Sequence, residues 1–187
     1  DGQTLEIMGH RQQGDRVVLL ARGVASPRSL LVVTPGLWQA AATHQSVALN
    51  TVLADQPGLG DRLLPTLQNH LGLNPTALKT TLQQQASAIP PLATVQRWQV
   101  VDDASTEMLL TLTPELLTLQ GLSAAGEQPT QLLLTAQGEL LYSNLWSGTA
   151  PKVVGWLRPP SDQPALVVRQ GDRAQVLFWS PQNRRFQ

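Results

Sequence analysis

The stretch QLLLTAQGELLYSNLW, residues 131–146, decides the fold class of this chain. A run of leucines is followed by a turn at residues 136–138, and a second apolar run at residues 140–142 leaves that turn. Two apolar β-forming runs on either side of a short turn that contains glycine predict an antiparallel hairpin. The hairpin ends in a polar and aromatic tail, residues 143–146. The hairpin could form the floor of a binding pocket or only a buried part of the core.

Other segments show the same strand-like pattern, in which apolar residues alternate or form short runs bounded by turn residues. Further strands are predicted at residues 4–8, 16–24, 29–36, 95–102, 107–113, 115–122, 152–160, 165–170 and 173–180. The first two and the last two strands flank Gly-Asp turns and predict hairpins. The run at residues 29–36 is apolar without alternation, which predicts a strand buried on both faces.

Between residues 37 and 88 the apolar spacing changes to that of helices. Asn74 followed by Pro75 predicts an N-cap and a first helical residue, and Gly72 predicts the end of the preceding helix. Pro65 is expected near the first turn of its helix, where a missing N–H is tolerated. The predicted helices run from residue 37 to before Gln56, from about 60 to 71, and from 75 to about 88.

These elements predict an α+β fold in which the three-helix block, about residues 37–88, packs on one face of a mainly antiparallel sheet. We expect one domain over residues 1–187, since the length suits a single core. Its parts are a β-rich lead-in at 1–36, the helical block at 37–90 and an antiparallel meander at 95–180.

The charge balance and the length of the apolar runs argue against two classes of partner. The chain has 13 basic and 13 acidic residues and a net charge of zero, and charged residues make up only 14% of it. A nucleic-acid-binding protein usually shows a basic excess or stripe, and none is visible here. No apolar run approaches the length needed to span a bilayer, so we expect no direct membrane insertion of this segment.

The chain contains no cysteine, which excludes disulfides, thiol nucleophiles and thiolate metal sites. This absence leaves the compartment unknown but slightly favours an extracytoplasmic, periplasmic location over a cytoplasmic one. The chain begins with Asp1 and not with Met, so we expect a processed protein or a domain of a larger one.

No motif nominates catalytic chemistry. None of His10, His44 and His70 lies in a metal-binding or acid–base pattern, and no G-x-S-x-G elbow is present. The glycine-rich PGLGD segment at 57–61 lacks the Lys of a P-loop and is interpreted as an inter-helix turn. Asp102-Asp103 is interpreted as a turn. We therefore expect no catalytic residue, no metal and no cofactor.

Tryptophan is the abundant aromatic residue, with five copies against one Tyr and two Phe. Four of these tryptophans lie in or at the end of predicted strands, and Trp38 is predicted to begin a helix. Indole rings fill cores, and they also stack on ligands and anchor protein interfaces. The four in strands are Trp98, Trp146, Trp156 and Trp179.

The hairpin at 131–146 resembles the central hairpin of PAS- and Cache-type sensory domains, and the strands that follow it are similar in order. The resemblance covers residues 95–180 and includes no specific motif, and Ala136 stands where an Asp or Asn is more usual. It implies a ligand enclosed between the sheet face and the helices. Tyr142, Asn144 and Trp146 would then lie at the pocket rim.

Two functions follow from these patterns. The first is a non-catalytic sensory or ligand-binding domain that takes a small molecule, belonging to a larger signalling or membrane-associated protein. The alternative is a structural or assembly module that binds another protein through an uncharged surface containing Trp. Trp156 joins Tyr142, Asn144 and Trp146 as a candidate ligand or interface residue, and a homodimer stays an open alternative. An enzyme, most plausibly a hydrolase with a dispersed site, is the least favoured reading.

Overall fold

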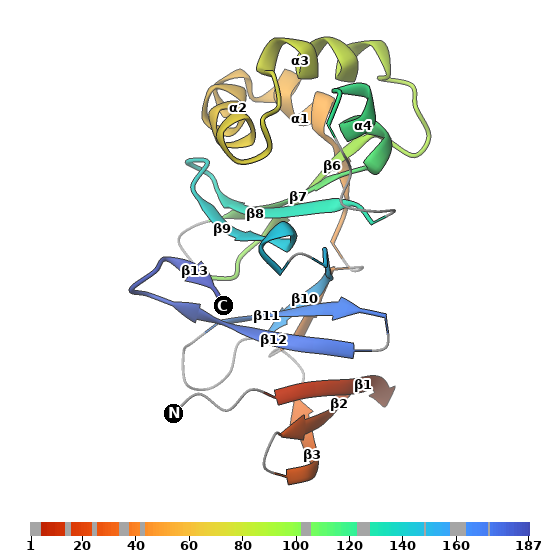
Figure 1. The fold of residues 1–187 in the computed structure, drawn as a ribbon, viewed down its shortest axis with the longest axis vertical. Helices are drawn as coiled ribbons and strands as arrows, with labels where there is room; N and C mark the ends of the chain where they lie inside the picture. Colours follow the sequence, from red (N-terminus) through yellow and green to blue (C-terminus); the bar gives the residue numbers. More distant parts are fainter. Residues whose placement is uncertain are drawn as a thin grey trace. The chain divides into compact units, whose positions relative to one another are not determined.

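Two antiparallel sheets organise the chain in the computed structural model (Figure 1). The structure describes residues 5–13, 16–23, 26–33, 38–41, 44–101, 106–122, 128–147, 149–157, 164–171 and 173–187. The predicted turns at 14–15, 35–36 and 102–103 lie outside these residues. The chain forms two compact units, whereas the sequence was interpreted as one domain. The outer unit is Asp1–Thr43 with Pro151–Gln187, and the inserted unit is His44–Ala150.

The outer unit contains the first sheet, whose strand order is β3-β2-β1-β12-β11-β10-β4, with β13 paired to β12. Its strands are β1 Leu5–Gln13, β2 Arg16–Gly23, β3 Ser26–Val33, β4 Trp38–Ala40, β10 Lys152–Leu157, β11 Ala165–Gln170, β12 Arg173–Ser180 and β13 Arg185–Phe186. The hairpins β1–β2 and β11–β12 are confirmed. The strand predicted at 29–36 is β3, which lies at one end of this strand order.

The inserted unit contains the second sheet, with the strand order β5-β6-β7-β8-β9. Its strands are β5 Val47–Ala48, β6 Ala93–Trp98, β7 Glu107–Leu112, β8 Thr130–Thr135 and β9 Leu140–Ser143. The hairpin of residues 131–146 is confirmed as β8–β9, in which Leu133 lies opposite Tyr142. The 3₁₀ helix η2, Asn144–Ser147, follows it.

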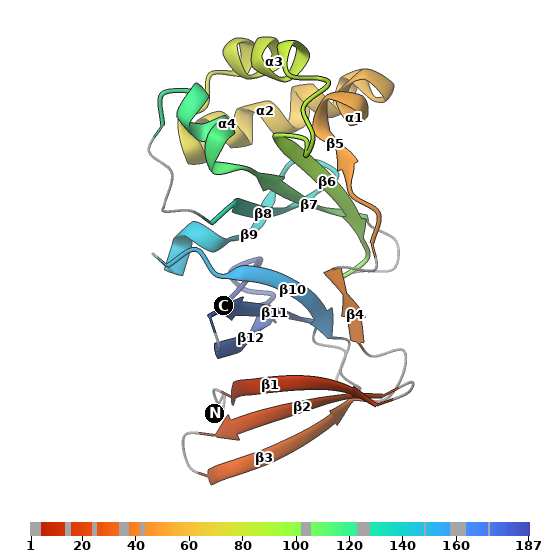
Figure 2. The same ribbon diagram turned by 90° about the vertical axis from the view of Figure 1, so that its right-hand side faces the viewer.

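The helices of the inserted unit lie on one face of this sheet, as Figures 1 and 2 show, and the α+β prediction with antiparallel sheets is confirmed. They are α1 Leu49–Asp55, α2 Pro57–Leu71, α3 Pro75–Gln84 and α4 Pro114–Leu119.

The core between these helices and the sheet consists mainly of leucines. Alternate residues of β7, namely Met108, Leu110 and Leu112, point to the helices, and Leu132 and Leu134 of β8 join them. The helices contribute the buried residues Leu49, Val52, Leu59, Leu63, Leu64, Leu67, Leu78, Leu82, Leu116 and Leu117. Each fully buried leucine side chain contributes about 1.5–3 kcal/mol to folding.

The first predicted helix begins later than expected. Residue 37 was predicted to start it, but Trp38 begins strand β4 and Val47 begins β5, and the helix α1 begins at Leu49. Strand pairing of β4 with β10 and of β5 with β6 outweighs the weak helical spacing before residue 49. Its predicted end before Gln56 is confirmed.

The second helix begins earlier than expected. Pro57 occupies its first turn, so residues 57–61 are helical and the interpretation as an inter-helix turn is wrong. Pro65 therefore lies in the helix interior and not near its start. A proline there costs about 3 kcal/mol, and the burial of Leu63, Leu64 and Leu67 offsets that cost.

The segment 115–122 was predicted to be a strand, but residues 115–119 belong to the helix α4. Thr113 caps it, since its Oγ1 accepts a hydrogen bond from the backbone N–H of Leu116 at 3.3 Å. Pro114 occupies the first turn with Glu115, and both favour a helix start. The predictions at Gly72 and Asn74 are confirmed: Gly72 has a φ of 72°, and the Asn74 side chain accepts from two backbone N–H groups.

Candidate binding site

One face of α2 holds the β8–β9 hairpin. Arg62, Thr66 and His70 are spaced four residues apart, so they share a face of the helix. Thr66 Oγ1 donates a hydrogen bond to the carbonyl oxygen of Gly138 at 2.6 Å, and His70 Nε2 lies 2.9 Å from Ser143 Oγ. Gly138 lies against the backbone of Arg62. These contacts join α2 to the turn and to the end of the hairpin.

Tyr142 lies inside the structure and not at an open rim. It is only 3% exposed, and its hydroxyl makes no hydrogen bond within the described part of the chain. Burial raises the pKa of this phenol well above its usual value of 10.0. The phenol ring meets Trp146 edge-on, with ring centres 6.2 Å apart. Tyr142 therefore packs behind Trp146.

Asn144 ties the start of η2 to β8. Its Oδ1 accepts a hydrogen bond from the backbone N–H of Gln131 at 3.0 Å, and its Nδ2 donates to the carbonyl oxygen of Pro129 at 2.9 Å. The residue is fully buried. Both polar atoms of the side chain are thus engaged in holding the backbone.

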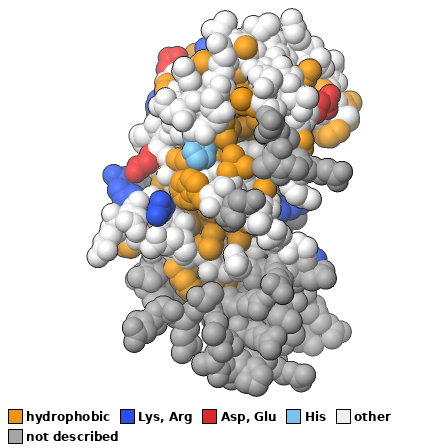
Figure 3. Space-filling model, in the orientation of Figure 1, with side chains coloured by type: hydrophobic (Ala, Val, Ile, Leu, Met, Phe, Trp, Pro, Cys, Tyr) orange, Lys and Arg blue, Asp and Glu red, His pale blue; other side chains and the backbone are white. Residues whose placement is uncertain are grey.

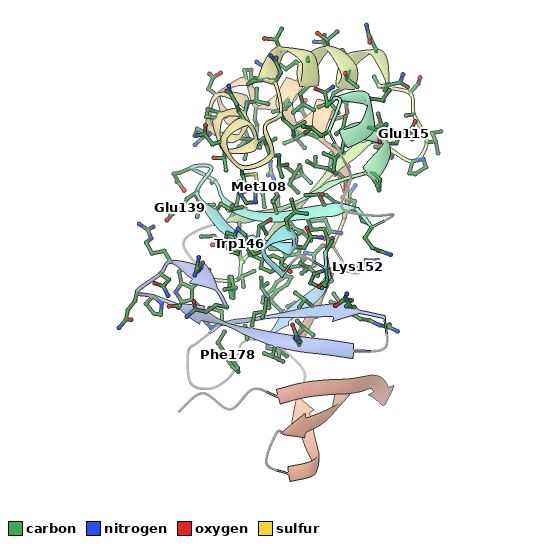
Figure 4. All side chains as sticks on the ribbon, in the orientation of Figure 1. Met108, Glu115, Glu139, Trp146, Lys152 and Phe178 are labelled. Carbon is green, nitrogen blue, oxygen red and sulfur yellow. The ribbon has the colours of Figure 1, made fainter. Side chains whose placement is uncertain are left out.

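Trp146 lies on η2, directly after β9 (Figure 4). It is the exposed member of the predicted set, with 44% of its surface accessible. Its indole meets the His70 ring at 6.2 Å in an edge-to-face arrangement. On the face that Figure 3 shows, hydrophobic side chains gather around a histidine, and charged side chains are few. Trp146 is therefore available to a partner, with His70 and Tyr142 fixing its orientation.

The other tryptophans whose side chains the structure describes are less accessible. Trp156 is buried. It lies on β10 in the outer unit, whereas the other three candidate residues lie in the inserted unit. Trp98 is buried at the end of β6, and its ring contacts that of His44. Trp179 is partly buried and packs on Phe186 at 5.2 Å between ring centres. The side chain of Trp38 lies outside the described residues.

A cleft of about 450 Å³, which no pattern in the sequence predicted, lies among the first three helices of the inserted unit. Each helix contributes residues at helical spacing: Asn50 with Leu53 on α1, Pro57 with Gly60 on α2, and Lys79 with Leu82 on α3. Among the described residues, the lining consists of Asn50, Leu53, Ala54, Pro57, Gly60, Lys79, Leu82, Gln83 and Ala86. The spacing of these residues in the sequence indicates that those on one helix share a face of that helix. It does not indicate that the faces of the three helices enclose a cleft.

The pair formed by His70 and Ser143 is a structural contact. Ser143 is fully buried, and its Oγ accepts a further hydrogen bond from the backbone N–H of Leu145 at 3.3 Å. Burial also lowers the pKa of His70 below its usual value. Because the Ser143 hydroxyl is buried and already hydrogen-bonded, we assign the pair to packing of α2 on the hairpin.

Within the described residues, no three His, Asp or Glu side chains are grouped so as to hold a metal ion. No described helix is long and apolar enough to cross a membrane. No protein-family model, curated protein or solved structure matches this chain. Its function is therefore inferred from the geometry of the molecule itself.

Proposed function

We propose that this protein is a non-catalytic ligand-binding module with a sensory role, and that its ligand occupies the cleft among α1, α2 and α3. The observation that carries this proposal is the cleft itself, whose volume of about 450 Å³ lies within the range of small-molecule sites. Its lining combines apolar side chains with the polar residues Asn50, Lys79 and Gln83, which is the usual composition of such a site.

The cleft is a better ligand site than the rim of the hairpin. Buried leucines of α2, α3 and β7 fill the space between the helices and the sheet. Tyr142 and Asn144 are buried, and both polar atoms of the Asn144 side chain already have backbone partners. A sensory role and the resemblance to PAS and Cache domains stay predictions. In that case, binding of the ligand in the cleft would change the packing of the helices.

Native mass spectrometry and calorimetry of the intact chain with a broad set of metabolites test the proposal. We expect saturable binding that is lost in Ala86→Trp, because an indole at this exposed position would fill the cleft. Ala77→Trp is the matched control, since Ala77 is also exposed on the helical layer but does not line the cleft. The absence of any saturable ligand would contradict the proposal.

A second candidate function rests on Trp146. An indole that is 44% exposed and held in place by two neighbouring rings suits a protein interface, where Trp often dominates the binding energy. In this case the partner is another protein or a second copy of the chain. Sedimentation of the protein, alone and with source extract, tests this. Trp146→Ala should abolish any stoichiometric complex, and a strictly monomeric protein with no partner would contradict it.

A further inference from the structure

We propose that the helical cleft binds an amphipathic anion, an acyl chain with a carboxylate head, and that Lys79 binds the head group. This inference rests on the proposed function, because it names the ligand class of the same site. It is carried by the arrangement of one cation on a mainly apolar lining.

The lining suits an acyl chain. Leu53 and Ala54 come from α1, Pro57 and Gly60 from the start of α2, and Leu82 from α3. Gly60 has no side chain, so it leaves room between Leu53 and the neighbouring turn of α2. Burial of apolar surface supplies about 25 cal/mol per Å² of affinity before the costs of association. An unbranched chain can use such a surface without any directional contact.

The charge of the lining suits an anionic head. Lys79 is the charged residue of the lining and is exposed, and it forms no ion pair within the described part of the chain. Asp55 and Asp61 follow the lining residues Ala54 and Gly60, but neither of them lines the cleft. The amide side chains of Asn50 and Gln83 can donate hydrogen bonds to a carboxylate. The head group therefore meets donors and one positive charge.

The cleft residues of α3 and of the turn after it define the length along which the ligand would lie. Lys79, Leu82, Gln83 and Ala86 lie at positions i, i+3, i+4 and i+7, on one stripe of the helix and of the turn that follows it. Residues 79 and 86 are separated by roughly 10 Å along a helix axis. A medium-length acyl chain, such as that of octanoate, matches this distance when its carboxylate lies at one end.

The test compares octanoate with 1-octanol by calorimetry on the intact chain near neutral pH. The two molecules share an apolar chain and differ in the charge of the head. We expect octanoate to bind more tightly, and Lys79→Gln to weaken octanoate by about threefold to fivefold while leaving 1-octanol unchanged. Lys152→Gln is the matched control, because Lys152 is the only other lysine and lies on β10. Ala86→Trp should abolish binding of both molecules.

The outcomes separate the two levels of the proposal. Equal affinity for octanoate and 1-octanol, with no effect of Lys79→Gln, would overturn the anionic ligand class and leave a neutral-ligand cleft. Binding that persists in Ala86→Trp would overturn the cleft as the site. If neither molecule binds but a different metabolite does so in a cleft-dependent manner, the ligand class is wrong and the proposed function stands. If nothing binds, both are wrong.

Discussion

Gly138 permits the close contact between the β8–β9 turn and α2. Its φ of 86° lies in the left-handed region, where a side chain is strained. A Cβ atom at this position would lie 2.9 Å from the carbonyl carbon of Arg62 and still closer to the carbonyl oxygen. Because these atoms are backbone atoms of a helix, they cannot move aside as a flexible side chain could. The glycine thus sets how closely the hairpin approaches α2.

Gly138→Ala should lower the free energy of unfolding by about 2–4 kcal/mol, from backbone strain together with the clash. Gly121→Ala provides the control, since Gly121 has a φ of 72° but nothing within 4 Å of the added Cβ. We expect it to cost about 1–2 kcal/mol. Urea unfolding followed by circular dichroism measures both variants. Equal losses would mean that the approach to Arg62 contributes nothing.

His70 should make the stability depend on pH. Burial lowers its pKa in the folded protein below the ordinary value of 6.5, so the unfolded chain binds the proton more readily. The contribution of His70 is therefore fully present above about pH 6.5 and is lost as the pH falls toward the lowered folded value. His70→Gln should flatten the loss of stability that begins as the pH falls below about 6.5. Melting temperatures that fall with pH as steeply in His70→Gln as in the unmodified protein would rule out His70 as the source of the pH dependence.

The contact of α2 with the hairpin also depends on Thr66. Thr66→Val keeps the shape of the side chain but removes its 2.6 Å hydrogen bond to the carbonyl oxygen of Gly138. We expect a loss of about 1 kcal/mol in the free energy of unfolding. Thr80→Val is the control, because the exposed Thr80 hydroxyl donates to the carbonyl oxygen of Thr76 within the same helix. If both variants lose the same free energy of unfolding, the hydrogen bond between α2 and the hairpin contributes no more than one within a helix.

The elements that the sequence predicts well are those with local signals. The hairpin at β8–β9, the glycine end of α2 and the Asn74 cap depend on residues that lie next to one another in the chain. One error arose where tertiary packing decided the outcome: Pro65 remains inside a helix because three buried leucines hold that helix. The error at residues 115–119 has a different cause, because Thr113 and Pro114 are a local helix-start signal that was interpreted as an interruption between strands.

The cleft could not be predicted, although the sequence shows the helical spacing of the residues that each helix contributes to its lining. Leu82 and Ala86 show only that α3 has a face, and nothing in the sequence shows how far that face lies from Leu53 on α1. The same limit applies to Trp146. Its aromatic character made it a candidate, but its exposure and its contact with His70 depend on the packing of α2.

The path of the chain explains the two units. Strands β4 and β10 are antiparallel neighbours in the first sheet, with Ala40 opposite Gly155. The chain leaves this sheet after β4, forms the whole inserted unit, and returns at the adjacent strand β10. Adjacent entry and exit points allow a domain to be inserted without disturbing its host. The inserted unit also has its own leucine core, drawn entirely from residues 49–134.

A fragment comprising His44–Ala150 should therefore fold by itself. Its core residues all lie within the fragment, as do both strands of the central hairpin and the cleft. We expect one cooperative thermal transition in circular dichroism. The matched fragment starts at Asp55 and lacks β5 and nearly all of α1, so it should lose cooperativity because Leu49 and Val52 leave the core. A broad, non-cooperative melt of the longer fragment would show that residues outside 44–150 complete its core.

The octanoate titration can be repeated on the same fragment. Retained affinity would place the whole ligand site within the inserted unit.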